Sequence, residues 1–389
     1  MHVAPTRPPF EGIRRIAVLR GGGLGDLLFA MPAIEALAAA YPDAEIVLLG
    51  SPTHRALLEG RPSPVARVEE LPIAPGIREE AGGQHDDRSV AEFRRRVLRA
   101  GTIDLGVQLH GGGRNSNPFL LALEPRHTVG SATPDAPALE RTLPYAYYQH
   151  EVMRGLEVAG LAGARPVTLE PRIQVTDRDR VAASPHLPAA GDRPFVAVHP
   201  GATDPRRRWP VEHFAHVVTG LLDAGATVAL LGDDGDRGPC AAIAERVAAD
   251  RPEASARLTD ASGRLPIGTT AAILEAADVV VANDSGPRHL AQAVGAATVG
   301  IFWFGNVINA APFGRERHRV HLSFTVRCPV CDVDVTQVGW TAQRCEHDES
   351  FVADVDPAAV LDDVLDLTAR SSPRSAPRAV PGSRIRRAG

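Results

Sequence analysis

The sequence predicts an α/β protein built from two Rossmann-like domains. Its 389 residues exceed what one hydrophobic core usually organises, so two domains of about 170 to 190 residues are expected. A short apolar strand, a glycine-containing loop, a helix and a second strand follow one another at 16–50 and again at 195–232. Such βαβ units impose parallel strands with helices on both faces, so two copies in separate halves predict two parallel sheets.

Composition limits the classes of partner. With 44% apolar and 23% charged residues and a net charge of -5, the chain is ordinary for a globular protein and gives no support for nucleic acid as a partner. It has no apolar run of about 18 residues, and positions 1–9 lack the apolar region of a signal peptide, so a cytoplasmic protein is expected. All 42 basic residues are Arg, so any site that ordinarily uses Lys must use Arg here.

The first glycine loop brings a carboxylate to the start of a helix. Residues 16–19 are typical of a buried strand, and apolar residues recur at helical spacing from Leu27 onward. The four glycines of 21–25 allow positive φ and close approach to a ligand, and Asp26 follows where the helix dipole favours a negative charge. Asp26 is therefore either a helix cap or a site residue, and the local sequence does not decide between them.

Turn signals and charge define the remaining organisation. Further strands are expected at 105–109, 279–282 and 298–302, a loop at 73–88, and a linker at 172–193, which is rich in Pro and charged residues. An amphipathic helix with Pro at its start is expected at 357–369, and the tail after it has five arginines and no acidic residue, which is typical of disorder. The expected units are an N-terminal domain at 1–180, a C-terminal domain at 181–356, a helix at 357–370 and a basic tail at 371–389.

Two strand-to-helix loops in the second half are typical of phosphate binding. The first reads His199-Pro-Gly-Ala-Thr-Asp-Pro-Arg-Arg-Arg-Trp-Pro210 and offers backbone N–H groups, a hydroxyl and guanidinium groups to an anionic oxygen. Three arginines alone are more typical of a solvated face. The second loop, Asn283-Asp284-Ser285-Gly286, joins a buried strand directly to a helix and places free N–H groups at the sheet edge where ligands bind.

Together these motifs resemble glycosyltransferase family 9, the ADP-heptose heptosyltransferases. The likeness runs from about Arg15 to Leu367 and rests on Gly25-Asp26 with Pro32 behind it, His199-Pro-Gly-Ala-Thr with Arg-Trp-Pro, and Asn283-Asp-Ser-Gly-Pro-x-His289-Leu-Ala. It implies a GT-B fold, in which two Rossmann-like domains face each other across a cleft, with the donor nucleotide on the C-terminal domain and the acceptor on the N-terminal one. It also implies metal-independent transfer with inversion at the sugar, from a nucleotide-sugar donor such as ADP-heptose and with no cofactor.

The resemblance also implies roles for individual residues. Asp26 takes the position of the general base that removes the proton of the acceptor hydroxyl. Arg207 stands where the family usually has a phosphate-binding Lys, and which of Arg206, Arg207 and Arg208 contacts the diphosphate is left open. The other donor-site residues expected are Gly201, Ala202, Thr203, Ser285 and Gly286 at the phosphates, Asp284 and His289 at the sugar, and Asp234 at the ribose hydroxyls.

The acceptor side is less defined. Its candidates are Gly25 and the polar residues that follow the strand at 105–109, namely Gln108, His110, Arg114 and Asn117, although loop polarity explains them equally well. The resemblance favours a glycan acceptor such as the lipopolysaccharide inner core, with a lipid-linked acceptor and peripheral membrane contact as further expectations. A small natural-product acceptor, a GT-B nucleotide-sugar epimerase and a non-catalytic nucleotide-sugar-binding protein are the alternatives.

Three of the four cysteines cluster near the end of the second half. Cys328, Cys331, Cys345 and His347 form a known set of zinc ligands, three thiolates and an imidazole. A single CxxC is also typical of reduced thiols in a loop or of a disulfide. We therefore keep a zinc site as the less favoured interpretation, and the family resemblance implies that no metal takes part in the reaction.

Overall fold

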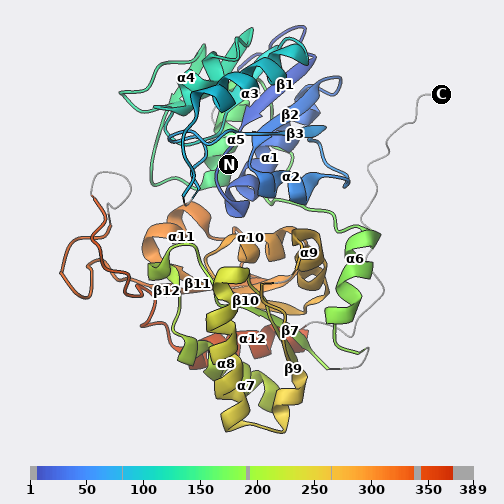
Figure 1. Ribbon diagram of the computed structural model, residues 1–389, viewed down its shortest axis with the longest axis vertical. Helices are drawn as coiled ribbons and strands as arrows, with labels where there is room; N and C mark the ends of the chain where they lie inside the picture. The colour runs from blue at the N-terminus through green and yellow to red at the C-terminus, as the bar shows by residue number, and fades with distance from the viewer. Residues whose placement is uncertain (1–6, 81, 190–192, 264, 337–342, 371–389) are drawn as a thin grey trace.

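The computed structural model describes residues 7–80, 82–189, 193–263, 265–336 and 343–370. They form two halves, one above the other in Figure 1, and each half is built around a parallel six-stranded sheet. The strand order is β3-β2-β1-β4-β5-β6 in the N-terminal half and β12-β11-β10-β7-β8-β9 in the C-terminal half. The expected α/β architecture of two Rossmann-like domains is thus confirmed.

In the N-terminal half, helices cover both faces of the sheet. Apolar side chains of α1 and α5 pack on one face, and those of α3 and α4 on the other. The expected loop at 73–88 contains a short antiparallel bridge between Ala74 and Arg78 and leads into α3. The strands are β1 (Arg15–Leu19), β2 (Glu45–Gly50), β3 (Arg67–Glu70), β4 (Leu105–Gln108), β5 (His127–Ala132) and β6 (Arg141–Pro144). The helices are α1 (Leu24–Ala40), α2 (Pro52–Leu58), α3 (Asp87–Arg99), α4 (Ser116–Leu121) and α5 (Glu151–Leu161).

The C-terminal half repeats this plan. Helices α7, α8 and α12 cover one face of its sheet, and α9 and α10 cover the face that is turned toward the N-terminal half. The strands are β7 (Phe195–His199), β8 (Thr227–Leu230), β9 (Leu258–Asp260), β10 (Val279–Asn283), β11 (Ala297–Trp303) and β12 (His318–Ser323). The helices are α6 (Asp177–Ala183), α7 (Val211–Asp223), α8 (Arg237–Asp250), α9 (Ile267–Ala276), α10 (Gly286–Ala293), α11 (Phe304–Ala310) and α12 (Pro357–Arg370).

The segment expected as a linker contains helix α6. Thr176 caps this helix, since its hydroxyl accepts the N–H of Asp179 at 3.2 Å while the Asp179 carboxylate accepts the N–H of Thr176 at 2.9 Å. Helix α6 packs on α9 of the C-terminal half, and Asp179 forms a 3.0 Å ion pair with Arg61 of the N-terminal half. The boundary expected at 180/181 therefore falls inside α6. The expected C-terminal helix is present as α12, and the basic tail at 371–389 lies outside the described residues.

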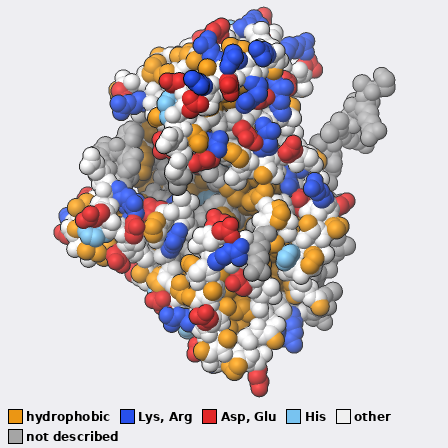
Figure 2. Space-filling view, viewed as in Figure 1, with side chains coloured by type: hydrophobic (Ala, Val, Ile, Leu, Met, Phe, Trp, Pro, Cys, Tyr) orange, Lys and Arg blue, Asp and Glu red, His pale blue; other side chains and the backbone are white. Residues whose placement is uncertain are grey.

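The two halves meet along helices. Helix α1 contacts α10, and α2 contacts α9, so that one apolar cluster runs through both halves. The two helices that carry the sequence motifs, α1 and α10, are thereby held against each other. Arginines and acidic residues are scattered over both halves on the face in Figure 2. Within the described residues, we find no helix that combines the length and the apolar character required to span a membrane.

Candidate active site

Asp26 lies in the first turn of α1, folded back against the glycine loop. Its Oδ2 accepts the N–H of Gly23 at 2.8 Å. Gly22 has φ +85°, and a Cβ at this position would lie 2.4 Å from the same carboxylate oxygen, so both the backbone conformation and the close approach require glycine. The Asp26 side chain is 46% exposed and lines the cleft between the two halves. It is therefore a helix cap and an accessible carboxylate at once.

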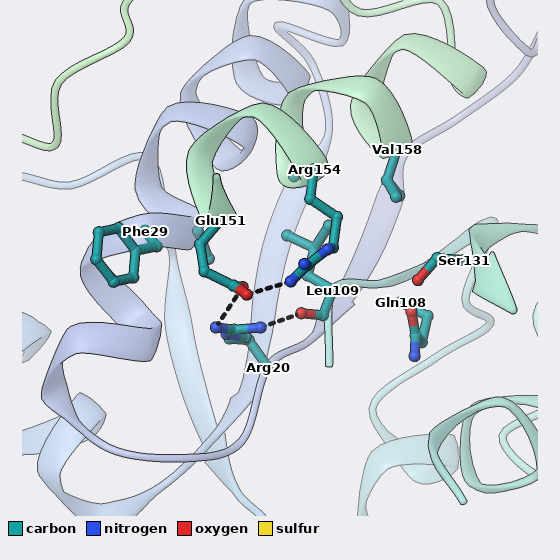
Figure 3. Close-up of a pocket in the computed structure, with 10 residues that line it drawn as sticks. Arg20, Phe29, Gln108, Leu109, Ser131, Glu151, Arg154 and Val158 are labelled. Carbon is teal, nitrogen blue, oxygen red and sulfur yellow. Dashed lines mark hydrogen bonds and ion pairs between the residues drawn. The ribbon is translucent and has the colours of Figure 1, made fainter. Parts of the chain in front are cut away.

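A buried arginine holds this carboxylate. Arg20 follows β1, and its Nη2 lies 2.6 Å from Asp26 Oδ1 and 3.2 Å from Glu151 Oε2. Figure 3 shows Arg20 between Glu151 and the carbonyl of Leu109, with Arg154 on the other side of Glu151. Burial alone would lower the pKa of Arg20, but Asp26 and Glu151 together raise it. Arg20 is thus a fixed cation that orients Asp26.

The cleft between the two halves has a volume of about 1130 Å³. The N-terminal half contributes the loop and first turn of α1, together with Phe29, Tyr145 and Glu151. The C-terminal half contributes the loops that follow β7, β8 and β10. These loops leave the carboxyl ends of parallel strands, which is where open α/β sheets bind ligands.

The arginine run divides into one buried and two cleft-lining side chains. Arg206 is only 8% exposed, forms a 2.6 Å ion pair with Asp204 and lies over the Phe351 ring. The expectation that a run of arginines forms a solvated face is therefore wrong for this residue. Arg207 and Arg208 both line the cleft. The Arg207 Nη1 lies 3.6 Å from Asp284 Oδ2, whereas the Arg208 Nε donates to the carbonyl of Ala202 at 2.8 Å.

A buried hydrogen-bond network lies at the second donor-side motif, the loop between β10 and α10. Asp284 Oδ1 lies 3.1 Å from His289 Nε2, and its Oδ2 accepts the amide of Asn306 at 2.7 Å. Burial would raise the pKa of Asp284, but His289, Arg288 and Arg207 together lower it to about 2. Asp284 is therefore a permanently charged group, and each of its oxygens already has a partner.

His289 is the neutral member of this network. Burial, and then the charge of Arg288, lowers its pKa to about 4. Since Arg288 Nη2 lies 2.6 Å from Nδ1 and can only donate, the ring hydrogen is on Nε2, where it is donated to Asp284. A Cβ added at Gly25 would lie 3.2 Å from His289 Cδ2, so the helix of one half rests directly on the motif of the other.

A second buried pair stands behind the phosphate loop and was missed by sequence reasoning. His199 Nε2 lies 3.3 Å from Asp236 Oδ2, and its Nδ1 lies 3.4 Å from the Ser285 hydroxyl. Burial would raise the pKa of Asp236, but His199 lowers it. A Cβ at Gly201 would lie 2.0 Å from Asp236 Oδ1, so this glycine makes room for the Asp236 carboxylate.

The remaining donor candidates reach the cleft. Ala202, Thr203, Ser285 and Gly286 line it, with Gly286 at the first position of α10. Asp234 also lines the cleft, with an 83% exposed side chain that pairs with Arg237 at 2.7 Å.

The acceptor-side candidates separate into two groups. Gln108 and Asn117 are fully buried, and their amides donate within the N-terminal half, so the structure does not bring them to the cleft. His110 and Arg114 line a neighbouring hollow of about 480 Å³, in which Arg114 is 77% exposed. Tyr145 and Tyr147 line both hollows and were missed by sequence reasoning, because no motif marks them.

The three cysteines and His347 come together, but outside the cleft. Their ligand atoms all lie within 4.8 Å of one another, and none of the four residues lines the cleft. The spacing noted in the sequence thus corresponds to a real cluster, and no disulfide joins these three cysteines.

Residues 95–331, more than half of the chain, match the family described as Glycosyltransferase family 9 (heptosyltransferase). The chain is 25% identical over 300 residues to lipopolysaccharide heptosyltransferase 2 of Escherichia coli (strain K12), which covers 74% of this chain and 82% of that protein. It is 25% identical over 325 residues to lipopolysaccharide heptosyltransferase 1 of Pseudomonas aeruginosa, which covers 82% of this chain and 86% of that protein.

Solved structures show the same fold. The glycosyl transferase of family 9 from Veillonella parvula superposes with a TM-score of 0.74 at 19% identity, over 94% of this chain and 100% of the other. The E. coli ADP-heptose lipopolysaccharide heptosyltransferase II superposes with a TM-score of 0.68 at 20% identity, over 92% of this chain and 99% of the other. The GT-B fold is thereby confirmed.

Proposed function

The chain belongs to glycosyltransferase family 9, and on that premise we propose that it transfers a heptose from ADP-heptose, with inversion at the sugar, to a hydroxyl of a lipopolysaccharide-core acceptor. The observation that carries this proposal is the position of Asp26 and Arg207, which line one cleft from opposite halves of the molecule. A carboxylate on one side and a guanidinium group on the other match what the two ends of a displacement reaction require.

Asp26 is the proposed general base. The acceptor hydroxyl attacks the anomeric carbon and loses its proton to the carboxylate as the new bond forms. Asp26 is exposed to the cleft, and Arg20 with the N–H of Gly23 holds it in one orientation. Each bonded oxygen keeps a further lone pair, so that a hydroxyl can still donate to it.

The C-terminal half is the proposed donor site. The bond from the sugar to ADP breaks as the new one forms, and the departing diphosphate oxygens gain negative charge. Arg207 and Arg208, together with the N–H groups at the start of α10, supply the compensating charge. Asp284 and His289 have a positioning role in this account, because the hydrogen bonds that Asp284 accepts from His289 and Asn306 fix the loop between β10 and α10.

The names of the relatives support the proposed acceptor. Both relatives described above are named for lipopolysaccharide, and we propose a related glycan, carried on a lipid, as acceptor. A lipid-linked acceptor requires only peripheral membrane contact. We propose that the protein works in the cytoplasm.

The test is an assay with ADP-heptose and truncated lipopolysaccharide inner core, with ADP release and the configuration of the new glycosidic bond as readouts. The proposal predicts ADP release only when both substrates are present, and a product whose anomeric configuration is opposite to that of the donor. ADP release without acceptor consumption, or transfer from UDP- or GDP-sugars alone, would contradict it.

A further inference from the structure

We propose that Cys328, Cys331, Cys345 and His347 bind one structural metal ion of the tetrahedral, thiolate-preferring class, with zinc expected, and that this ion holds the arginine run in place at the cleft. The segment that carries these residues, which we call the lobe (324–336 and 343–356), leaves the sheet after β12 and returns at α12. Figure 1 shows it projecting to one side of the C-terminal half, beside α11 and β12.

The geometry of the four ligands fits one ion. In a tetrahedral site with metal–sulfur bonds of about 2.3 Å, neighbouring ligand atoms lie about 3.8 Å apart. Cys328 Sγ and His347 Nδ1 are 3.7 Å apart, and all four ligand atoms lie within 4.8 Å of one another. Three thiolates and one imidazole complete four-fold coordination and leave no position for a substrate, which is the mark of a structural site.

The lobe also requires such a cross-link. Its described residues form no helix and no strand, only a bridge between Arg327 and Asp334. Its core consists of Cys328, Val335 and Phe351, with Trp303 and Cys345 against them. Val352 and Val355 anchor the end of the lobe in the main core of the C-terminal half, but the described part that carries the four ligands has only this small core. Small folds of this kind commonly depend on a metal ion.

The lobe connects the proposed metal to the arginine run. The N–H of Phe351 donates to the carbonyl of Arg206 at 2.7 Å, and the hydroxyl of Ser350 donates to the carbonyl of Arg208 at 2.7 Å. Phe351 packs in the same small core as Cys328 and Cys345, and its ring faces the Arg206 guanidinium. The backbone that carries Arg207 is thus held from the lobe side at the residues before and after it.

The connection from the metal ion to the arginine run rests on the proposed function, since it matters only if Arg207 and Arg208 hold the diphosphate.

The metal content of the protein tests the metal site independently of the proposed function. The full chain is purified from cultures supplied with zinc and iron, and both metals are measured by mass spectrometry alongside a count of free thiols. We expect one ion per chain, loss of that ion in Cys331→Ser and in Cys345→Ser, and retention in the control Cys240→Ala, whose thiol lies in the C-terminal core and is not part of the ligand cluster.

A variant could lose the ion because it fails to fold, so the ion is also counted in the wild-type protein. There a mercurial compound displaces the ion from the thiolates, and a colorimetric chelator measures the amount released. A protein that carries no ion as purified, and that takes up no Zn²⁺ after reduction, would overturn the site. A disulfide among the three cysteines would overturn it as well.

ADP affinity then tests the connection to the cleft. Loss of the ion is expected to weaken ADP binding about fivefold or more, the range of coupling between separate sites, while Arg207→Ala weakens ADP binding with the ion still present. Unchanged ADP affinity after metal loss would overturn the connection and leave the metal site standing. If the wild-type protein bound no ADP, the proposed function would fail, and the metal count would still decide the site.

Discussion

Arg20 and Asp26 form a 2.6 Å ion pair in which the arginine is 7% exposed and the aspartate 46% exposed. A buried cation therefore positions an accessible carboxylate at the cleft. The same guanidinium group also contacts Glu151 and the carbonyl of Leu109, so its own position is fixed by three partners. This arrangement connects the end of β1 to the start of α5 and makes the orientation of Asp26 a property of the whole N-terminal half.

Arg20→Lys is expected to lower turnover and to leave ADP affinity unchanged. Lys keeps the charge but lacks the planar fork that reaches Asp26 and Glu151 together. Steady-state kinetics and calorimetric ADP titration check this, with Arg14→Lys as the control, since Arg14 is 71% exposed and pairs with exposed Asp43. Equal turnover of Arg20→Lys and wild type would show that the orientation of Asp26 does not depend on this pair.

Arg207→Ala is expected to weaken ADP binding about 10- to 100-fold, the value of one or two hydrogen bonds to a charged group. Arg207→Lys should restore much of the loss, because the charge is retained. Arg251→Ala is the matched control, since Arg251 lies on the same half, is exposed and pairs with Asp223. Normal ADP binding by Arg207→Ala, together with weak binding by Arg208→Ala, would move the phosphate contact by one residue.

Arg206→Ala is expected to lower the stability of the protein, whereas Arg207→Ala is expected to weaken ADP binding. It removes the 2.6 Å ion pair with Asp204, which keeps its 3.9 Å contact with Arg344, and it removes the contact with Phe351. Together these losses are expected to cost about 2 kcal/mol in the free energy of unfolding. Denaturant titration measures this. A stability equal to that of wild type would contradict the buried position of Arg206.

The stability of the protein should fall between pH 7 and pH 5, in part because of His318. Burial, and then Arg288, Arg317 and Arg319, lowers the pKa of this histidine to about 4. The unfolded chain takes up a proton near pH 6.5 and the native protein does not, so stability is present above pH 6.5 and is lost as the pH falls toward 4. The loss from this one group is roughly 2 kcal/mol between pH 7 and pH 5.

Urea unfolding at the two pH values, for wild type and for His318→Gln, checks this linkage. The variant should show a smaller loss of stability on acidification than wild type does. Equal losses would indicate that His318 is protonated in the native protein.

Transfer should not require a metal in the cleft. Arg207 and Arg208 line the cleft beside the proposed diphosphate site, and in this account their charges stabilise the leaving group in place of a divalent ion. Brief exposure to EDTA is therefore expected to leave turnover unchanged, and added Mg²⁺ should not raise it. Immediate loss of activity in EDTA, restored by Mg²⁺, would contradict metal-independent transfer.

The sequence predicted the features that depend on local patterns. The two βαβ units, the glycine loop before Asp26 and the loop from β10 to α10 were found because strand periodicity, glycine and helix starts are encoded within about 30 residues. The family resemblance, and not the local pattern, implied that Asp26 of one half and Arg207 and Asp284 of the other face one cleft, and all three line it.

Features that depend on distant contacts could not be predicted in this way. Arg20 gains its role from Glu151, which is 131 residues away, and Arg206 is buried because the lobe folds over it with Phe351. Helix α6 was taken as linker because its seven residues are too few to show a clear period, and its packing on α9 stabilises it. Gln108 and Asn117 looked like site residues because their polarity is visible in the sequence, whereas their internal hydrogen bonds are not.

The most direct test of the account is the turnover of Asp26→Asn with saturating ADP-heptose and acceptor, measured beside its ADP affinity. Asn keeps the shape of the side chain but cannot accept a proton, so turnover should fall by about 10² to 10⁴ while ADP affinity is unchanged. The control is Asp43→Asn, a 76% exposed aspartate in the turn after α1, which should behave as wild type. Turnover of Asp26→Asn within about tenfold of wild type, in a variant that folds and binds ADP normally, would contradict the assignment of Asp26 as the general base.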